Sequence, residues 1–280
     1  MTERELLKDK KRIVIKIGSS SLTHAETGDL NLAKIEKLVR IISDMRGMGK
    51  EVILVSSGAI ATGRQTLGGK KPETVAEKQA YAAVGQARLM MVYQKLFSEY
   101  NQTAAQILIT KATILDDTSR TNAKNTFNEL LKLGTVPIVN ENDTVSTYEI
   151  KFGDNDRLSA IVAASWKATC YSFSPISTAS TPTIRRKTRT RSSSARWMIL
   201  PMNLWLWVRE PQEVTWERWN GDEAPCGKDR DGERSDMVIA NADDLEVMWR
   251  ILKGEEIGTL FKANKSSEFA LLDYIQSIHA

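Results

Sequence analysis

Two short apolar segments near the start of the chain, residues 12–17 (RIVIKI) and 51–55 (EVILV), predict buried β-strands. Between them, residues 30–45 carry apolar side chains at helical spacing with Lys, Glu and Arg between them, which predicts an amphipathic helix. A strand, a helix and a second strand within so short a length imply parallel strands joined by a right-handed crossover. Both strands therefore end at the same edge of one sheet.

The alternation of strands and helices continues along the chain. We expect helices at residues 74–84, 86–100, 120–133 and from 158 to 164, and strands at 104–109 and 136–139. After residue 234 we expect a strand at 237–241, a helix at 242–252, a strand end at 258–261 and a short amphipathic helix at 267–278. This order is typical of the α/β class, here a three-layer αβα sandwich with a mainly parallel central sheet.

The most polar stretch follows one of these buried strands, at residues 138–158 (IVNENDTVSTYEIKFGDNDRL). It holds two acidic turns, residues 140–143 and 153–156, around a segment with strand-like alternation. Ligands of open α/β folds bind at the carboxyl ends of the strands, so this stretch predicts part of a binding site. The alternative is that both turns are solvated loops.

Small residues end the first two strands, at residues 18–21 (GSSS) and 56–59 (SSGA). Gly18 and Gly58 would let the backbone approach a ligand, and backbone N–H groups at a helix start bind phosphate or carboxylate. Lys16 lies at the end of a buried strand, where a lysine is costly unless it is paired, so it is a candidate phosphate contact. A strand-end lysine that reaches solvent is the alternative. Neither GxxxxGK[ST] nor GxGxxG occurs.

Composition excludes several classes of protein. With 280 residues the chain can form one large α/β domain or two small ones, and its 41% hydrophobic and 26% charged residues are ordinary for a globular protein. Cys170 and Cys226 form no CxxC, so neither a disulfide framework nor a zinc site is indicated. No secretory signal and no apolar run of roughly 18 residues is visible, so we expect a cytoplasmic protein without a membrane span.

Six segments resemble one known family in order and in spacing, and the similarity covers about residues 11–164 and resumes at 235–261. They are KIGSS (16–20), VSSGAIATGR (55–64), AAVGQARLM (82–90), NAKNTFNELL (122–131), VPIVNENDTVS (136–146) and IKFGDNDRLSA (150–160). The family is the glutamate 5-kinases of the amino-acid kinase superfamily. The pair NEND and GDND separates these from the carbamate, aspartate, acetylglutamate and uridylate kinases, of which carbamate and uridylate kinases are kept as alternatives.

The resemblance implies ATP-dependent phosphorylation of the γ-carboxylate of L-glutamate, the first step of proline biosynthesis, with Mg²⁺. It assigns Lys16 and Asp154 to catalysis, Lys16 and Gly18 to the nucleotide, and Ser57, Asp143, Asn155 and Asp156 to glutamate, with Asp154 and Asp156 near the amino group or the metal. Phosphoryl transfer needs cations and N–H donors and no protein nucleophile, which agrees with this set. We name no metal-ligating residue.

The resemblance also bears on the organisation of the chain. It implies a single amino-acid kinase domain over residues 1–280, with a glutamate-binding half at about 11–166, a nucleotide-binding half at about 167–262 and no C-terminal PUA domain. Inhibition by proline and a homo-oligomer are expected, whereas nucleic acid and membrane are not expected partners. His24 and His279 lie outside the motifs, and we expect both at the surface.

Residues 168–234 break the pattern. They are rich in Ser, Thr and Arg without periodicity, and five of the seven Trp residues of the chain follow in this region. Reading residues 216–234 in a shifted frame gives GNGGMATKLRAARIATESG, a glycine-rich phosphate loop and a helix, and residues 169–214 in the other frame give an apolar strand and a DGLYTDDP loop. We interpret the segment as the product of three single-base shifts; a genuine Arg- and Trp-rich nucleic-acid or membrane segment is the alternative.

This break predicts two consequences. The ATP-binding lysine and the glycine loop of the family would lie at Glu223 and at residues 216–219, so no ATP contact can be assigned there. The printed chain should also lack a central strand and a covering helix. An inactive protein that still binds glutamate or proline is therefore the alternative function.

Overall fold

The computed structural model describes residues 4–146, 155–166, 168–174 and 235–261. In this part of the chain one sheet has the strand order β3-β4-β2-β1-β5-β6-β7, and neighbouring strands are parallel except for the antiparallel pair β6 and β7. The strands are β1 (Arg12–Ile17), β2 (Glu51–Ser56), β3 (Ala104–Ile109), β4 (Val136–Glu141), β5 (Thr169–Ser174), β6 (Met237–Asn241) and β7 (Thr259–Phe261).

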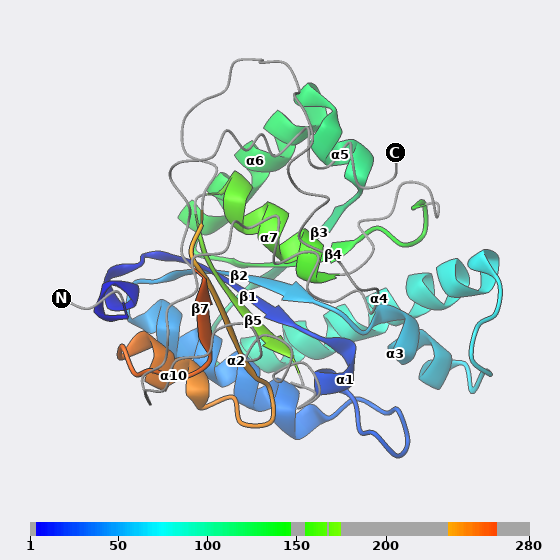
Figure 1. Cartoon of the computed structure of the whole chain (residues 1–280). Helices are drawn as coiled ribbons and strands as arrows, with labels where there is room; N and C mark the ends of the chain where they lie inside the picture. Colours follow the sequence, from blue (N-terminus) through cyan, green and yellow to red (C-terminus); the bar gives the residue numbers. More distant parts are fainter. Residues whose placement is uncertain (1–3, 147–154, 167, 175–234, 262–280) are drawn as a thin grey trace, which may run out of the picture.

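Helices cover both faces of the sheet, so the predicted three-layer αβα sandwich is confirmed (Figure 1). One face carries α2 (Leu32–Gly47), α4 (Val75–Glu99) and α10 (Val247–Leu252). The other carries α5 (Lys111–Leu115), α6 (Asp117–Lys132) and α7 (Asn155–Ser165). The remaining elements are the 3-10 helix η1 (Glu5–Asp9) and the helices α1 (Ser19–Leu22) and α3 (Ala59–Thr66), which follow β1 and β2 directly.

Strand β1 is a continuous apolar run whose side chains pack into two hydrophobic cores, one on each face of the sheet. Ile13, Ile15 and Ile17 pack into the core beneath α2 and α4, whereas Val14 packs into the core beneath α7. Successive side chains of a strand point to opposite faces, so Lys16 lies on the same face as Val14, towards α7. The sequence pattern of β1 thus decides on which side of the sheet its one charged interior residue lies.

Local signals set the helix ends. The Asn31 side chain accepts a hydrogen bond from the backbone N–H of Lys34 and begins α2, and Thr74 with Glu77 forms a capping box that begins α4. Gly134 has a φ of 72° and ends α6, as predicted, because glycine adopts this left-handed conformation at little cost.

Helix α4 corrects the prediction of two helices at 74–84 and 86–100. It runs without a break through Gly85. A Cβ atom on Gly85 would lie 1.8 Å from the carbonyl oxygen of Ala59, and one on Gly63 would lie 1.8 Å from that of Tyr81. The two glycines therefore allow α3 and α4 to pack backbone against backbone, and Gly85 does not end a helix.

Strand β5 corrects the prediction that the printed chain lacks a central strand. It lies between β1 and β6, with Val14 opposite Cys170, and Cys170, Tyr171 and Phe173 are buried. Aromatic and β-branched residues suit a strand that is buried on both faces, and TCYSFS supplies enough of them to fill this place. The remainder of the irregular segment, residues 175–234, and the helix predicted at 267–278 lie outside the described residues.

Smaller differences concern the ends of elements. Asn140 and Glu141 were expected in a turn but form the buried end of β4, and α7 begins at Asn155, three residues earlier than expected. The expected helix at 242–252 is shorter and begins at Val247. His24 is exposed as predicted, while His279 lies outside the described residues. Within the described ranges, none of the helices is long and apolar enough to cross a bilayer.

Candidate functional site

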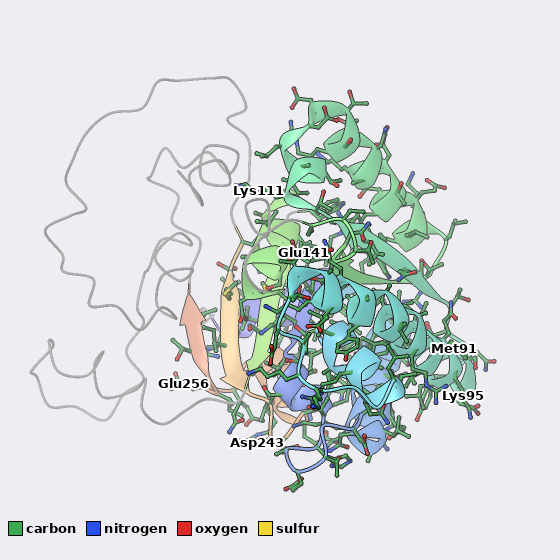
Figure 2. All side chains as sticks on the ribbon, turned by 90° about the vertical axis from the view of Figure 1, so that its right-hand side faces the viewer. Met91, Lys95, Lys111, Glu141, Asp243 and Glu256 are labelled. Carbon is green, nitrogen blue, oxygen red and sulfur yellow. The ribbon has the colours of Figure 1, made fainter. Side chains whose placement is uncertain are left out.

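A cavity of about 510 Å³ opens at the carboxyl edge of the sheet, where β1, β2 and β4 end. It lies where binding sites of open α/β folds are found. Figure 2 shows Glu141 near the centre of the described part of the molecule, whereas Met91 and Lys95 of α4 lie at its margin. The lining residues are Ser19, Ser57, Gly58, Ala59, Ile60, Ala61, Arg64, Lys71, Pro72, Lys78, Asn140, Glu141, Asp143 and Asn155.

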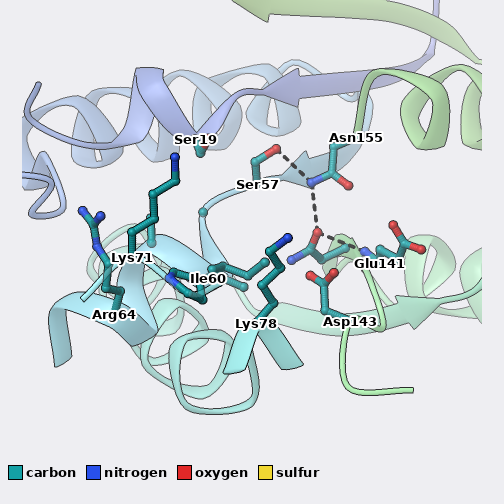
Figure 3. Close-up of a pocket in the computed structure, with 14 residues that line it drawn as sticks. Ser19, Ser57, Ile60, Arg64, Lys71, Lys78, Glu141, Asp143 and Asn155 are labelled. Carbon is teal, nitrogen blue, oxygen red and sulfur yellow. Dashed lines mark hydrogen bonds between the residues drawn. The ribbon is translucent and has the colours of Figure 1, made fainter. Parts of the chain in front are cut away.

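Asn155 joins the parts of this cavity. Its Nδ2 donates to Ser57 Oγ at 2.8 Å and to Asn140 Oδ1 at 2.9 Å, so the starts of α7 and α3 and the end of β4 are tied to one side chain (Figure 3). The backbone N–H of Glu141 donates to the same Asn140 oxygen at 2.9 Å. Asn140 is 3% exposed and Glu141 is 8% exposed, so these residues do not form a solvated loop.

Charge is divided across the cavity. Figure 3 shows Arg64 and Lys71 on one side and Glu141 and Asp143 on the other, with Lys78 between them. Arg64 belongs to α3 and Lys78 to α4, whereas the two carboxylates belong to the end of β4 and the residues after it. A zwitterion with an ammonium at one end and carboxylates elsewhere fits such an arrangement electrostatically.

The first turn of α3 adds backbone donors. Gly58 has a φ of 105°, which lets the chain turn sharply from β2 into α3. Ala59, Ile60 and Ala61 then line the cavity with the N-terminal end of this eight-residue helix. The unpaired N–H groups and the helix dipole make this end favourable for an anionic group.

A buried ion pair lies beside the cavity and not in its lining. Lys16 Nζ is 2.7 Å from Asp156 Oδ1, and the two side chains are 3% and 7% exposed. Ser172 Oγ donates to the same carboxylate oxygen at 3.0 Å. The alternative of a lysine that reaches solvent is therefore wrong, since Lys16 is buried and paired.

Below Ser57, a second buried bond fixes the strand end. Ser56 Oγ and the hydroxyl of Tyr93 lie 2.8 Å apart, and both residues are buried. Burial raises the pKa of Tyr93 far above its ordinary value, so this hydroxyl stays protonated at physiological pH. The bond links β2 to α4 directly beneath the cavity.

The structure thus divides the predicted site residues. Ser57, Asp143 and Asn155 line the cavity together, whereas Lys16, Gly18 and Asp156 do not line it, and Asp154 lies outside the described residues. The expectation that Asp156 lies near an amino group or a metal stays a prediction; in the structure its carboxylate contacts Lys16, whose side chain lies on the α7 side of β1.

Several lining residues were not predicted. Asn140 and Arg64 belong to the motifs NEND and VSSGAIATGR, so a residue-by-residue reading of those motifs could have found them. Lys71 lies in the polar segment between α3 and α4, and Lys78 lies just inside α4. At both positions periodicity indicates only an exposed face.

A second cavity of about 260 Å³ adjoins the first and shares Ala59, Glu141 and Asp143 with it. Gln86 lines this second cavity and not the first. Among the described residues, no cluster of His, Cys, Asp and Glu has the composition of a protein-held metal site. The charged and polar side chains that line the first cavity suit a small charged molecule.

Comparisons with known proteins show which family the chain resembles. The model of the amino acid kinase family matches residues 11–174. A glutamate 5-kinase of Clostridium perfringens is 43% identical over 94% of this chain and 99% of its own length, and one of Carboxydothermus hydrogenoformans is 44% identical over 95% of this chain and 72% of its own length. The crystal structure of a UMP kinase from Bacillus anthracis shares the fold, with a TM-score of 0.55, 15% identity and coverage of 90% of this chain and 96% of that one.

Proposed function

The chain belongs to the amino acid kinase family and, within it, to the glutamate 5-kinases, and from this we infer that it phosphorylates the γ-carboxylate of L-glutamate with ATP. The products are γ-glutamyl phosphate and ADP. The observation that carries this inference is the similarity to glutamate 5-kinases over nearly the whole length of both chains. A UMP kinase shares only the fold, so it does not support the alternative of a uridylate kinase.

The chemistry needs little from the protein beyond position and charge. One γ-carboxylate oxygen of glutamate attacks the γ-phosphorus of ATP, a new P–O bond forms, and the bond to the β,γ-bridging oxygen breaks. The attacking carboxylate is ionised at neutral pH, so no general base is required. This agrees with a cavity whose described lining includes amides, hydroxyls, cations and carboxylates, with neither His nor Cys among the described lining residues.

We propose that the divided charge of the cavity orients glutamate. Asp143, with Glu141 beside it, would pair with the substrate ammonium, while Arg64 and the hydroxyl of Ser57 would receive a carboxylate. Asn155 would complete this site through its bond to Ser57. Each partner carries the charge or donor that the corresponding substrate group requires.

For the phosphoryl group, we propose Lys16 as the protein cation and Gly18 as the point of close backbone approach. Lys16 lies near the end of β1, next to β2, which Ser57 directly follows, and Asp156 holds its ammonium in place. A lysine beside the transferring group stabilises the charge that spreads over the phosphoryl oxygens. We also retain Asp154 as a proposed catalytic residue.

Mg²⁺ belongs to the proposal as the companion of ATP. Magnesium in kinases is held largely by the phosphates, with one or two carboxylates and water, so a dedicated cluster of protein ligands is not required. When bound, the ion would neutralise the charge of the transferred phosphoryl group. The acidic residues near the sheet edge, of which Asp143 lines the cavity, can supply one or two such carboxylates.

We propose further that residues 168–234 reflect single-base shifts relative to a glutamate 5-kinase gene, and that the nucleotide-binding half at about 167–262 is intact in the unshifted product. The end of the family match at residue 174 supports this. Sequencing the gene across this region tests it: an unbroken frame that still encodes RKTRTRSSSARW would refute the shifts.

A cytoplasmic location, a homo-oligomer, proline biosynthesis as the pathway and inhibition by proline complete the proposal. The similarity to glutamate 5-kinases is the support for all four. Gel filtration tests the homo-oligomer directly, and inhibition assays with proline test the inhibition by proline.

The decisive experiment is a hydroxamate assay of the product of the unshifted reading frame, with ATP, Mg²⁺, hydroxylamine and one acceptor at a time. Glutamate should give product, whereas aspartate, carbamate and UMP should not. Lys16→Ala and Asp143→Asn should each abolish most of the rate. Product from another acceptor at a greater rate than from glutamate would refute the proposed function.

A further inference from the structure

The hydrogen bonds behind the first cavity have a fixed direction. A backbone N–H can only donate, so the Asn140 side-chain atom 2.9 Å from the N–H of Glu141 must be the carbonyl oxygen Oδ1. The amide nitrogen of Asn140 therefore points the opposite way. It donates to Gln86 Oε1 at 2.9 Å, within the buried interior.

The orientation of the Asn140 amide also determines the orientation of the Asn155 amide and the role of the Ser57 hydroxyl. Only the amide nitrogen of Asn155 can face Asn140 Oδ1, and this nitrogen also donates to Ser57 Oγ at 2.8 Å. A hydroxyl that accepts from Asn155 keeps its own hydrogen for another acceptor. Because Ser57 lines the cavity, that hydrogen is available to a ligand.

We propose that Gln86 is a positioning residue for the substrate: together with the backbone N–H of Glu141, its side-chain carbonyl oxygen holds the Asn140 amide in the position that aligns Asn155 and makes Ser57 a hydrogen-bond donor to a substrate carboxylate. The inference rests on the proposed function, in which this cavity binds glutamate. Gln86 lines the second cavity and not the first, so it acts through Asn140 and not by contact with substrate.

The burial of the pair explains why an acceptor is required at position 86. Asn140 is 3% exposed and Gln86 is 8% exposed, so water cannot readily replace a lost partner. Without the acceptor, the buried Asn140 amide nitrogen would be left unsatisfied, and apart from the bond with Asn155 only the bond from the N–H of Glu141 would still fix this side chain, so Asn140 would shift from its place. A shifted Asn140 would weaken its bond to Asn155 Nδ2, and Asn155 would no longer be held in the position from which it donates to Ser57 Oγ.

Two substitutions separate this role from simple packing. Gln86→Met keeps the length of the side chain and removes the acceptor, whereas Gln86→Glu keeps an oxygen that can accept from Asn140. In steady-state assays of the full chain in its unshifted reading frame, Gln86→Met should raise the KM for glutamate about tenfold, the loss of about one hydrogen bond to a charged group. The KM for ATP should stay within about twofold, and Gln86→Glu should restore most of the affinity for glutamate.

A matched control lies on the same helix. Gln94 of α4 is exposed, so Gln94→Met should leave both KM values unchanged. A second comparison keeps the test decisive even if Gln86→Met is less stable. Because Gln86 acts through Ser57, the double variant Gln86→Met with Ser57→Ala should have the same KM for glutamate as Ser57→Ala alone.

The outcomes separate the two proposals. Equal KM values for Gln86→Met and the wild-type chain, equal losses for Gln86→Met and Gln86→Glu, or additive effects with Ser57→Ala would each overturn the positioning role while leaving the kinase intact. No turnover and no calorimetric binding of glutamate by the wild-type chain would overturn the proposed function, and the positioning role with it.

Discussion

Lys16 Nζ lies 2.7 Å from Asp156 Oδ1 in the interior of the protein, where the two side chains are 3% and 7% exposed. The pair ties the end of β1 to the first turn of α7, and Ser172 of β5 donates to the same carboxylate. Two charges taken out of water are tolerated only when each is well paired. The pair is therefore both part of the interior and the proposed source of the phosphate-binding cation.

Asp156→Asn should strongly destabilise the protein, because it leaves the Lys16 ammonium buried without its counter-ion. We expect a loss of about 3 kcal/mol or more in the free energy of unfolding. Urea denaturation followed by circular dichroism measures it. The exposed pair of Lys132 and Glu129 on α6 provides the control, since Glu129→Gln should leave the unfolding midpoint unchanged.

The double variant Lys16→Met with Asp156→Leu should separate stability from activity. Apolar residues of similar size can replace a buried ion pair with little loss of stability, so the double variant should be more stable than Asp156→Asn alone. It should nevertheless lack kinase activity, because the proposed phosphate-binding cation is gone. An active double variant would remove Lys16 from the mechanism.

Gly63→Ala and Gly85→Ala should each disrupt the contact between α3 and α4. The added Cβ atoms would lie 1.8 Å from the carbonyl oxygens of Tyr81 and Ala59, so the helices must separate. We expect a loss of about 3 kcal/mol or more in either variant, measured by thermal unfolding. Gly47→Ala on α2 is the control, because a Cβ there meets nothing within 4 Å and should be neutral or stabilising by up to about 1 kcal/mol.

The sheet was largely predictable from the sequence because its strands are continuous apolar runs. β1 begins and ends where residues 12–17 predict it, since every residue after Arg12 is buried. Periodicity could not foresee that α4 continues through Gly85, because the reason lies in α3, a different element of the chain. It also could not foresee β5, whose place is decided by pairing with β1 and β6 on either side.

The site was predictable only in part, for a similar reason. The motifs place Ser57, Asp143 and Asn155 at one edge, and the structure brings all three to one cavity. The role of Gln86 depends on a hydrogen bond across 54 residues to Asn140, which no local pattern encodes. Burial of Asp156 against Lys16 likewise depends on how α7 packs on β1.

Tyr93→Phe and Tyr171→Phe should have opposite effects on stability. The hydroxyl of Tyr93 bonds Ser56, so its removal leaves a buried serine unsatisfied and should cost about 1–2 kcal/mol. The hydroxyl of Tyr171 is buried and has no hydrogen-bond partner within the described structure, so its removal should be neutral or stabilising. Chemical denaturation of the two variants in parallel measures the difference; equal losses would contradict it.

Arg64→Met should weaken glutamate binding more than ATP binding. Arg64 lines the basic side of the cavity, and a partly exposed charge pair with a carboxylate contributes about 1–2 kcal/mol, so the KM for glutamate should rise about five- to thirtyfold. Added salt should raise the KM of the wild-type chain and affect the variant less. Arg40→Met, on the exposed face of α2, is the control, and an equal effect of both changes would argue against a contact with substrate.

Cys170 should make stability depend on pH only in the alkaline range. Burial raises the pKa of its thiol from 9.0 to about 12, so the folded protein keeps the proton that the unfolded chain loses. The contribution is complete below about pH 9 and is lost as the pH rises towards 12, by about 1.4 kcal/mol per pH unit for this group. In a Cys226→Ser background, comparing Cys170 with Cys170→Ala by urea denaturation at pH 8, 9 and 10 isolates this term, because the tyrosines contribute equally to both chains. The two chains should run nearly parallel from pH 8 to 9, and the chain that retains Cys170 should lose stability more steeply from pH 9 to 10. The same pH dependence in both chains up to pH 10 would contradict a buried thiol.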